Sequence, residues 1–304
     1  MELSGVWGSA TSGELGDNTT VNKSSPVQIG NLTTWQDIAC FNYHTAGVTS
    51  DGKLWTWGYN NYGQLGDNTI INKSSPVQVG NLTTWKLSAC GSYNTYSIKT
   101  DGTLWAWGIN HYGQLGNSTR DYKSSPIQVG SLTTWKYVAC GTWHVIAIKT
   151  DGTLWGWGYD QFGQCGDGNY GADNAISSPV QVGNLTTWAR VNIFSGQYFS
   201  HSIKTDGTIW AWGQGAYGEL GLGDITNCYS PVQIGNLTTW QKGGGGSGPV
   251  SAIKTDGTIW NWGQGEGGQL GDLVLQDRSS PIQVGNLTTW KNISTGGYHS
   301  IATK

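Results

Sequence analysis

Short apolar stretches bounded by turn residues recur along this chain, and none shows the sustained 3.6-residue period of a helix. Asp151-Gly152 predicts a two-residue hairpin turn, because Asp-Gly tolerates the positive φ that such a turn requires. Pro126 predicts an outermost strand, because proline cannot donate to a ladder. The chain is therefore predicted to be all-β. One set of strands is expected at residues 126–129, 135–140, 144–150 and 153–158.

The same pattern returns about every 50 residues, and tryptophans mark the period. A fixed period of this length, with four short antiparallel strands in each unit, is typical of propeller blades. The sequence predicts a single domain over residues 1–304, a six-bladed β-propeller of four-stranded antiparallel blades. The second Trp of each Trp-x-Trp-Gly segment stands at 7, 57, 107, 157, 212 and 262, and the Trp that ends each (Asn/Ser)-Leu-Thr-Thr-Trp segment stands at 35, 85, 135, 188, 240 and 290.

The two ends of the sequence carry complementary halves of one repeat. Residues 298–304 match the second strand of a unit, and residues 3–8 match the third. A composite blade, with two strands from each terminus, is therefore expected to close the ring and to cover edges that would otherwise invite aggregation. The first residues carry neither a basic nor an apolar leader, so no secretion signal is expected.

Composition narrows the classes of partner. The net charge is −3 and only 12% of the residues are charged, so no basic field is available for nucleic acid or anionic lipid. No apolar run approaches the ~18 residues of a membrane span. The five cysteines form no paired spacing, which favours a reducing compartment. We expect no nucleic-acid binding, no membrane insertion, and a location in the cytoplasm or in a virus particle.

One copy of the repeat, residues 55–66, reads Trp-Thr-Trp-Gly-Tyr-Asn-Asn-Tyr-Gly-Gln-Leu-Gly. Together with residues 139–144 and 147–152 it resembles the regulator of chromosome condensation repeat family, over essentially the whole chain. The resemblance implies a β-propeller, although the best-known members have seven blades. The family includes a nucleotide-exchange factor for a small nuclear GTPase, ubiquitin-ligase subunits and a bacterial inhibitor of β-lactamases. It therefore implies partner binding by a propeller face. The exchange factor's basic tail and GTPase-contacting wedge have no identified counterpart here, so exchange activity is not expected.

The differences between repeats concentrate on one predicted face. In a four-stranded blade, the first-to-second turn and the third-to-fourth loop lie on the same face. The third-to-fourth loops vary, as in residues 18–23, 117–122, 168–174 and 273–278. Rigid scaffolds with variable loops on one side usually bind there, while drift in surface loops that contact nothing is the alternative.

Aromatic side chains recur in the turns and loops of this variable face. They suit protein hot spots or stacking against sugar rings, and the alternative is that each ring packs over its own hairpin. The candidate binding residues are Tyr43, Tyr59, Tyr62, Tyr93, Tyr112, Trp143, Tyr159, Phe162, Tyr198, Tyr217 and Tyr298.

No constellation of residues indicates catalysis, a cofactor or a metal. His44, His144 and His299 share one slot but fall on non-adjacent blades, so histidines hydrogen-bonded within their own blades are favoured over a zinc site. Asp167-Gly168-Asn169 with Asp173 lacks the sixth-position Gly and the closing Glu of a calcium loop. Residues 243–246, four glycines, predict a weakened first strand.

The sequence therefore predicts a non-catalytic binding platform. Its expected partner is a protein held on the variable face. The alternative is a glycan or cell-surface receptor bound by the aromatic rim. An enzyme is the least favoured class, because no chemistry-bearing constellation is found.

Overall fold

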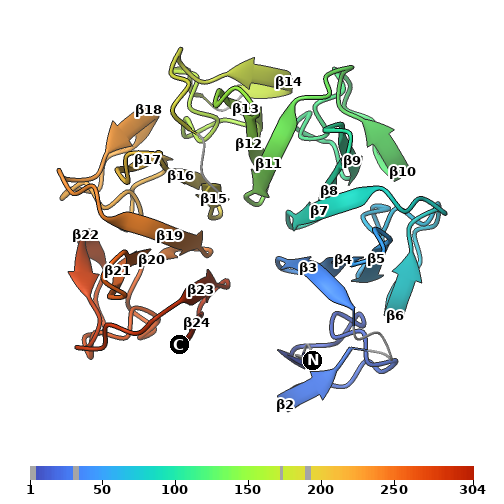
Figure 1. Cartoon of the computed structure of the whole chain (residues 1–304), viewed down its shortest axis with the longest axis horizontal. Helices are drawn as coiled ribbons and strands as arrows, with labels where there is room; N and C mark the ends of the chain where they lie inside the picture. Colours follow the sequence, from blue (N-terminus) through green and yellow to red (C-terminus); the bar gives the residue numbers. More distant parts are fainter. Residues whose placement is uncertain (1–4, 30–33, 172–173, 189–192) are drawn as a thin grey trace. The chain divides into compact units, whose positions relative to one another are not determined.

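A computed structural model describes residues 5–29, 34–171, 174–188 and 193–304, and every regular element in them is a β-strand (Figure 1). The predicted all-β class is confirmed for these residues. They contain no helix long and apolar enough to cross a membrane. The chain forms two compact units, Met1–Val138 and Ala139–Lys304, and each is described by itself.

The first unit contains ten strands and the start of an eleventh among its described residues. They are β1 (Gly5–Gly8), β2 (Lys23–Gln28), β3 (Trp35–Cys40), β4 (His44–Thr49), β5 (Leu54–Gly58), β6 (Lys73–Gln78), β7 (Trp85–Cys90), β8 (Asn94–Lys99), β9 (Leu104–Gly108), β10 (Lys123–Gln128) and β11 (Trp135–Cys140), which ends in the second unit. β1 pairs with β2. Two four-stranded sheets follow, in the orders β3-β4-β5-β6 and β7-β8-β9-β10.

The described part of the second unit continues the pattern. Its strands are β12 (His144–Lys149), β13 (Leu154–Tyr159), β14 (Ala175–Gln181), β15 (Ile193–Ser195), β16 (Phe199–Ile203), β17 (Ile209–Gly213), β18 (Cys228–Gln233), β19 (Trp240–Gly245), β20 (Pro249–Lys254), β21 (Ile259–Gly263), β22 (Arg278–Gln283), β23 (Asn292–Thr295) and β24 (Ser300–Thr303). The sheet orders are β11-β12-β13-β14, β15-β16-β17-β18, β19-β20-β21-β22 and β23-β24. The predicted four-stranded repeat is confirmed, and pairing between the two-stranded sheets stays a prediction.

The Asp-Gly segment connects two hairpin strands as predicted, but the turn is longer than the expected two residues, because the backbone N of Lys99 donates to the carbonyl of Thr103 and the backbone N of Gly102 donates to the carbonyl of Lys99, each at 3.0 Å. The same turn holds the connection to the next blade. Gly102 has φ +78°, and the side chain of Asp101 accepts hydrogen bonds from the backbone N and the Oγ1 of Thr103, at 2.9 and 2.7 Å. The backbone N of Trp135 donates to the carbonyl of Gly102 at 3.0 Å. A Cβ on Gly102 would lie 2.2 Å from the carbonyl oxygen of Thr133. Glycine is therefore required here both by the turn and by the close approach of the connector.

The fourth strand differs from the prediction at its start. β10 begins at Lys123, three residues before Pro126, and its register with β9 shifts between Lys123 and Ile127. The expectation that proline begins the strand was therefore wrong. A bulge accommodates the missing donor inside the strand, and the strand does lie at the edge of its sheet.

The second Trp of the Trp-x-Trp-Gly segment anchors one blade to the loop before it at Trp57, Trp107, Trp212 and Trp262. Trp107 and Trp212 are fully buried, and their indole nitrogens donate to the carbonyl oxygens of Gln64 and Gln164 at 2.9 and 3.0 Å. Each acceptor lies in the third-to-fourth loop of the preceding blade. An unsatisfied buried donor would cost about 1–3 kcal/mol. The packing of this large side chain therefore fixes both the core and the approach of the neighbouring loop.

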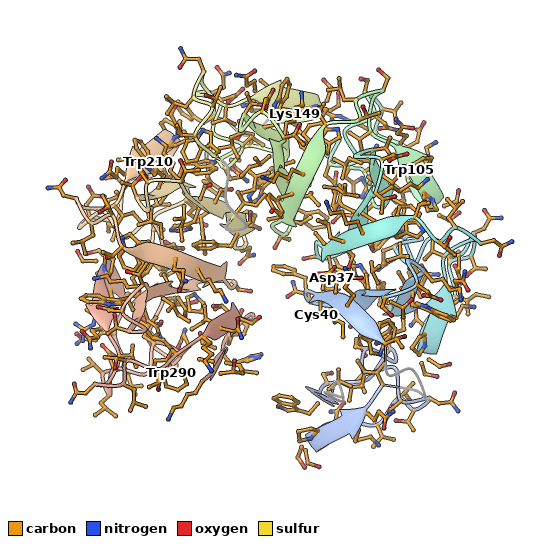
Figure 2. The ribbon with its side chains drawn as sticks, viewed as in Figure 1. Asp37, Cys40, Trp105, Lys149, Trp210 and Trp290 are labelled. Atoms are coloured by element: carbon orange, nitrogen blue, oxygen red, sulfur yellow. The ribbon has the colours of Figure 1, made fainter. Side chains whose placement is uncertain are left out.

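A lysine at the end of the second strand lies over tryptophan rings in most repeats. The Nζ of Lys99 is 3.7 Å from the ring centroid of Trp105 and 4.8 Å from that of Trp85. The Nζ of Lys149 lies 3.4 Å from the ring of Trp155. Figure 2 labels Trp105 and Lys149 in their blades. This cation–π arrangement accounts for the lysine of the Lys-Thr-Asp-Gly segment, which sequence reasoning left unexplained.

The glycine-rich segment forms a complete strand, β19, and its expected weakening stays a prediction. Gly243, Gly244 and Gly245 pair in register with Ala252, Ser251 and Val250 of β20. A Cβ on Gly243 would lie 2.3 Å from the ring of Phe194, on the neighbouring first strand β15. The glycines therefore allow an aromatic ring from the adjacent blade to pack on the strand.

Candidate functional site

Four of the predicted aromatic residues meet in the first unit. Tyr43, in the β3–β4 turn, stacks on Tyr93, in the β7–β8 turn, with ring centroids 4.9 Å apart and 13° between planes. Tyr62, in the β5–β6 loop, meets Tyr93 edge-on at 5.1 Å. Tyr59 lies 6.0 Å from both Tyr43 and Tyr93. Turns and loops from two adjacent blades therefore share one face.

The third-to-fourth loop of the next blade extends this group. Tyr122 meets Tyr62 edge-on at 5.8 Å, and its hydroxyl hydrogen-bonds to the imidazole of His111. Tyr112 lies 6.4 Å from His111. Tyr43 and Tyr122 are each 39% exposed. Tyr122 and His111 escaped the sequence prediction because they stand outside the slots it singled out. The unit 1 cluster is Tyr43, Tyr59, Tyr62, Tyr93, His111, Tyr112 and Tyr122.

Two tyrosines of this cluster, Tyr93 and Tyr122, favour their neutral form. Burial, followed by the hydrogen bond with Tyr43, raises the pKa of Tyr93. Burial, followed by the nearby Tyr62, raises the pKa of Tyr122. Both phenols therefore present an apolar ring and an uncharged hydroxyl at physiological pH, which suits a surface that contacts protein through aromatic groups.

A smaller group forms in the second unit. Tyr198, in the β15–β16 turn, lies 5.3 Å from Phe162, in the β13–β14 loop of the preceding blade, and 6.1 Å from Tyr159, the last residue of β13. Farther along the same loop, Tyr170 is 60% exposed and stacks on Tyr229 at 3.8 Å. The unit 2 cluster is Tyr159, Phe162 and Tyr198.

The remaining predicted residues are Trp143, Tyr217 and Tyr298. Trp143 is half-buried in the β11–β12 turn, and its carbonyl accepts a hydrogen bond from the backbone N of Tyr159 at 2.9 Å. Tyr217 and Tyr298 are 45% and 72% exposed. The turn residues Tyr93 and Tyr198 contact rings of the preceding blade. This differs from the alternative that each ring covers only its own hairpin.

A buried asparagine holds the β5–β6 loop in shape. The Oδ1 of Asn60 accepts a hydrogen bond from the backbone N of Leu65 at 2.9 Å. Its Nδ2 donates to the carbonyls of Thr69 and Ile71 and to Oδ1 of Asp67, each at 3.2 Å. A fully satisfied buried amide of this kind rigidifies the loop around it.

The tips of the third-to-fourth loops expose aliphatic side chains. Ile70 and Ile71 are each 63% exposed, directly beside the Asn60 network. Other repeats also expose an aliphatic side chain in this loop: Val21 is 60% exposed, Ile225 64% and Leu275 68%. Sequence reasoning identified these loops as variable but did not single out their apolar tips.

The histidines at one repeated position, His44 and His144, form hydrogen bonds to the next blade. The Nε2 of His44 lies 2.7 Å from Oγ1 of Thr95 on the next blade, and that hydroxyl donates to the carbonyl of Gln64. His144 meets Oγ of Ser200 in the same way at 2.8 Å. Burial lowers the pKa of both histidines to about 3. The expected bond within each histidine's own blade was therefore wrong, since the acceptor belongs to the following blade.

The described residues contain no group of three or more His, Cys, Asp or Glu side chains that could hold a metal ion. Asp173, part of the calcium consideration, lies outside the described residues. Cys140 is buried, and burial raises the pKa of its thiol. The inner strands are instead joined by hydrogen bonds: Asp37 on β3, labelled in Figure 2, accepts from the backbone N of Ser88 on β7 at 2.7 Å.

A hollow of about 650 Å³ separates two adjacent blades of the first unit. Leu82, Trp85 and Trp105 give it an apolar lining, and Lys99 and Pro126 complete its walls. The corresponding hollow beside Trp188 and Trp210 measures only about 270 Å³.

Solved structures of similar fold cover nearly the whole chain. Human WBSCR16 is 19% identical, with a TM-score of 0.86 over 98% of this chain and 80% of that one. Prp20p from Saccharomyces cerevisiae, described with its binding to Gsp1p and histones, is 20% identical, with a TM-score of 0.74 over 99% of this chain and 92% of that one. Yeast RCC1 (Prp20) bound to Kap60 is 19% identical, with a TM-score of 0.72 over 99% and 90%. These likenesses show the fold.

No curated protein matches this sequence closely enough to count as a relative. The family model described as the RCC1-like domain matches residues 5–304. This match confirms the resemblance found in the sequence. The chain therefore belongs to the RCC1-like domain family.

Proposed function

We propose that this protein is a non-catalytic binding platform that holds protein partners on its variable loop face. The observation that carries the proposal is the unit 1 cluster. Its tyrosines come from adjacent blades, Tyr43 and Tyr122 are partly exposed, and the hydrogen bonds of Asn60 hold the loop that carries Tyr62. Binding energy at protein interfaces concentrates in such aromatic residues. The fold relative Prp20p binds Gsp1p and histones, which supports protein partners as a class.

The test compares two exposed surfaces of the same chain. Purified protein is used to capture partners from the native source with chemical crosslinking, and each partner is quantified. Tyr43→Ser with Tyr122→Ser should reduce capture at least about tenfold, the effect of losing roughly 1.4 kcal/mol of binding free energy. The control is Leu132→Ser, 44% exposed, in a fourth-to-first connector. Retention of every partner after replacement of residues 117–122 and 167–177 would contradict the proposal.

We infer further that six blades form one propeller domain, with β23-β24 and β1-β2 as the two halves of a composite blade. The support comes from register: Ala46 pairs with Thr56 in a complete blade, and the matching positions in the end strands are Ile301 and Val6. Cysteines at these two positions should form a disulfide under mild oxidation, since cross-strand Cβ atoms lie within bonding range. Single-cysteine variants are the controls, and failure of the double variant to crosslink intramolecularly would contradict closure.

Two further predictions concern glycan recognition and the location of the protein. Glycan recognition by the aromatic rim gains no support from the relatives described, and a glycan array would test it directly. The location in the cytoplasm or in a virus particle stays a prediction.

A further inference from the structure

In one repeat, the buried asparagine that holds the third-to-fourth loop in shape is replaced by an aspartate. Asn110 in the β9–β10 loop repeats the Asn60 pattern: its Nδ2 donates to Oδ1 of Asn117 at 3.2 Å and its Oδ1 accepts from the backbone N of Leu115. The corresponding residue in the β13–β14 loop is Asp160, whose Oδ1 accepts from the backbone N of Cys165 at 2.8 Å. An ionised carboxylate has no donor to offer the facing Asp167.

The same repeat also lacks the cation that balances the second carboxylate. Lys73 lies opposite Gly58 in the β5–β6 ladder and forms an ion pair with Asp67 at 3.5 Å. At the matching position of the β13–β14 ladder, Ile176 lies opposite Gly158. Asp167 therefore lacks the amide and the ammonium partners of Asp67, and the hydrogen bonds that it accepts come from the backbone N and the Nδ2 of Asn169, at 2.9 and 2.8 Å.

Asp160 is fully buried, and hydrogen bonds join it to Asn174, at the other end of the β13–β14 loop. Its Oδ2 accepts a hydrogen bond from Nδ2 of Asn174 at 2.8 Å, and its backbone N donates to the carbonyl of Asn174 at 3.1 Å. The pKa of Asp160 is raised to about 7. Burial is the largest cause, and the charge of Asp167 and a hydrogen bond with Asp167 also raise this pKa. Among the described residues, the titratable groups facing Asp160 are Asp167 and the buried thiol of Cys165.

We propose that Asp160 and Asp167 form a proton-dependent latch on the variable face. With one proton between them, the Asp160 hydroxyl donates to the Asp167 carboxylate and the loop is held closed. When that proton leaves to solvent, the two carboxylates face each other with no donor or cation between them, and their repulsion opens the loop. No other third-to-fourth loop of the described residues combines both replacements.

The latch controls residues that are available to a partner. The backbone N of Gly168 donates to the carbonyl of Tyr229 on the next blade at 2.9 Å, and exposed Tyr170 stacks on the Tyr229 ring. Opening the loop would disturb this pair. A pH effect on partner binding rests on the proposed function, whereas the latch itself does not.

Amide hydrogen exchange of the full chain tests the latch without any partner. After correction for intrinsic rates, protection of the Gly168 and Gly171 amides should fall about tenfold between pH 6 and 8 and then level off, as expected for opening linked to one proton whose pKa in the closed loop is about 7. The Asn68 amide, which donates to the carbonyl of Ser124 at 2.8 Å in the matching loop, is the internal control and should keep its protection.

Two variants separate the carboxyl pair from general loosening. Asp160→Asn restores the amide found at Asn60 and should abolish the pH dependence. Ile176→Lys restores the cation beside Asp167 and should move the transition to lower pH. Protection of Gly168 that is independent of pH between 6 and 8.5 in the unmodified chain overturns the latch. So does an unchanged transition in either folded variant. Loss of partner capture by the tyrosine variants bears only on the proposed function.

Discussion

Single glycines decide how closely neighbouring strands approach in this protein. Gly243 packs against the ring of Phe194 from the adjacent blade. Replacing Gly243 with Ala should destabilise the second unit by about 1–3 kcal/mol, because overpacking forces a ring or a strand to move. Urea unfolding followed by circular dichroism measures the change.

The control for Gly243→Ala is the same substitution in a chain that lacks the ring of Phe194. In a Phe194→Ala background the obstacle is gone, so the added methyl of Gly243→Ala should cost much less. An equal cost in both backgrounds would show that the loss comes from the strand itself and not from the ring.

Residue positions could be predicted more readily than residue partners. The slots of Tyr43, Tyr93 and Tyr198 follow from the repeat, because their turns recur at fixed spacing. Their contacts with rings of a neighbouring blade could not be predicted, since the distance between blades is set by three-dimensional packing. For the same reason the acceptors of His44 and His144 were assigned to the wrong blade.

At the scale of the element, the lysine between two tryptophans ties the second strand to the strands beside it. The Nζ of Lys204 lies 3.5 Å from the ring of Trp210, labelled in Figure 2, and 4.6 Å from that of Trp188. Lys204→Met keeps the aliphatic stem and removes the charge, so it should destabilise by about 0.5–2 kcal/mol. Lys86→Met, on the exposed position of β7, is the matched control and should change the free energy of unfolding little.

Strands and hairpins were predictable because their signals are local. Asp-Gly fixes the second-to-third turn, and residues 135–140 form β11 with the predicted bounds. The outer strand was misplaced at its start because a bulge lets Pro126 sit inside a ladder, which depends on the pairing strand. The latch pair of Asp160 and Asp167 also escaped prediction, since only the register places Ile176 in the lysine position.

For the whole molecule, buried histidines make stability depend on pH. Burial is the largest cause lowering the pKa of His44, His144 and His201 to about 3, from 6.5 when unperturbed. The neutral forms stabilise the fold fully above pH 6.5, and that contribution is lost as pH falls from 6.5 toward 3. Each pH unit in this window costs roughly 1.4 kcal/mol per histidine. Asp160 and Glu219, with pKa values raised to about 7, offset part of this loss down to about pH 4.

The contribution of one histidine to this pH dependence can be measured with a residue that another repeat has at the same position. Asn94 occupies the slot of His44 in the next repeat, so His44→Asn is a natural replacement. Between pH 7 and 4.5, the stability of the unmodified protein relative to His44→Asn should fall by about 3 kcal/mol. His299→Asn changes an exposed side chain and serves as the control. A constant difference across this range would contradict the linkage.

The bond from Trp135 to the carbonyl of Gly102 recurs between Trp188 and Gly152, at 3.1 Å. Adjacent blades are joined in this way through the turn that hardly varies between repeats, on the side away from the aromatic turns and loops. Substitutions that remodel the β5–β6 or β13–β14 loop therefore leave these joints intact. New recognition surfaces could arise one loop at a time, and a foreign loop grafted between the outer two strands of a single blade should inherit a scaffold that is already assembled.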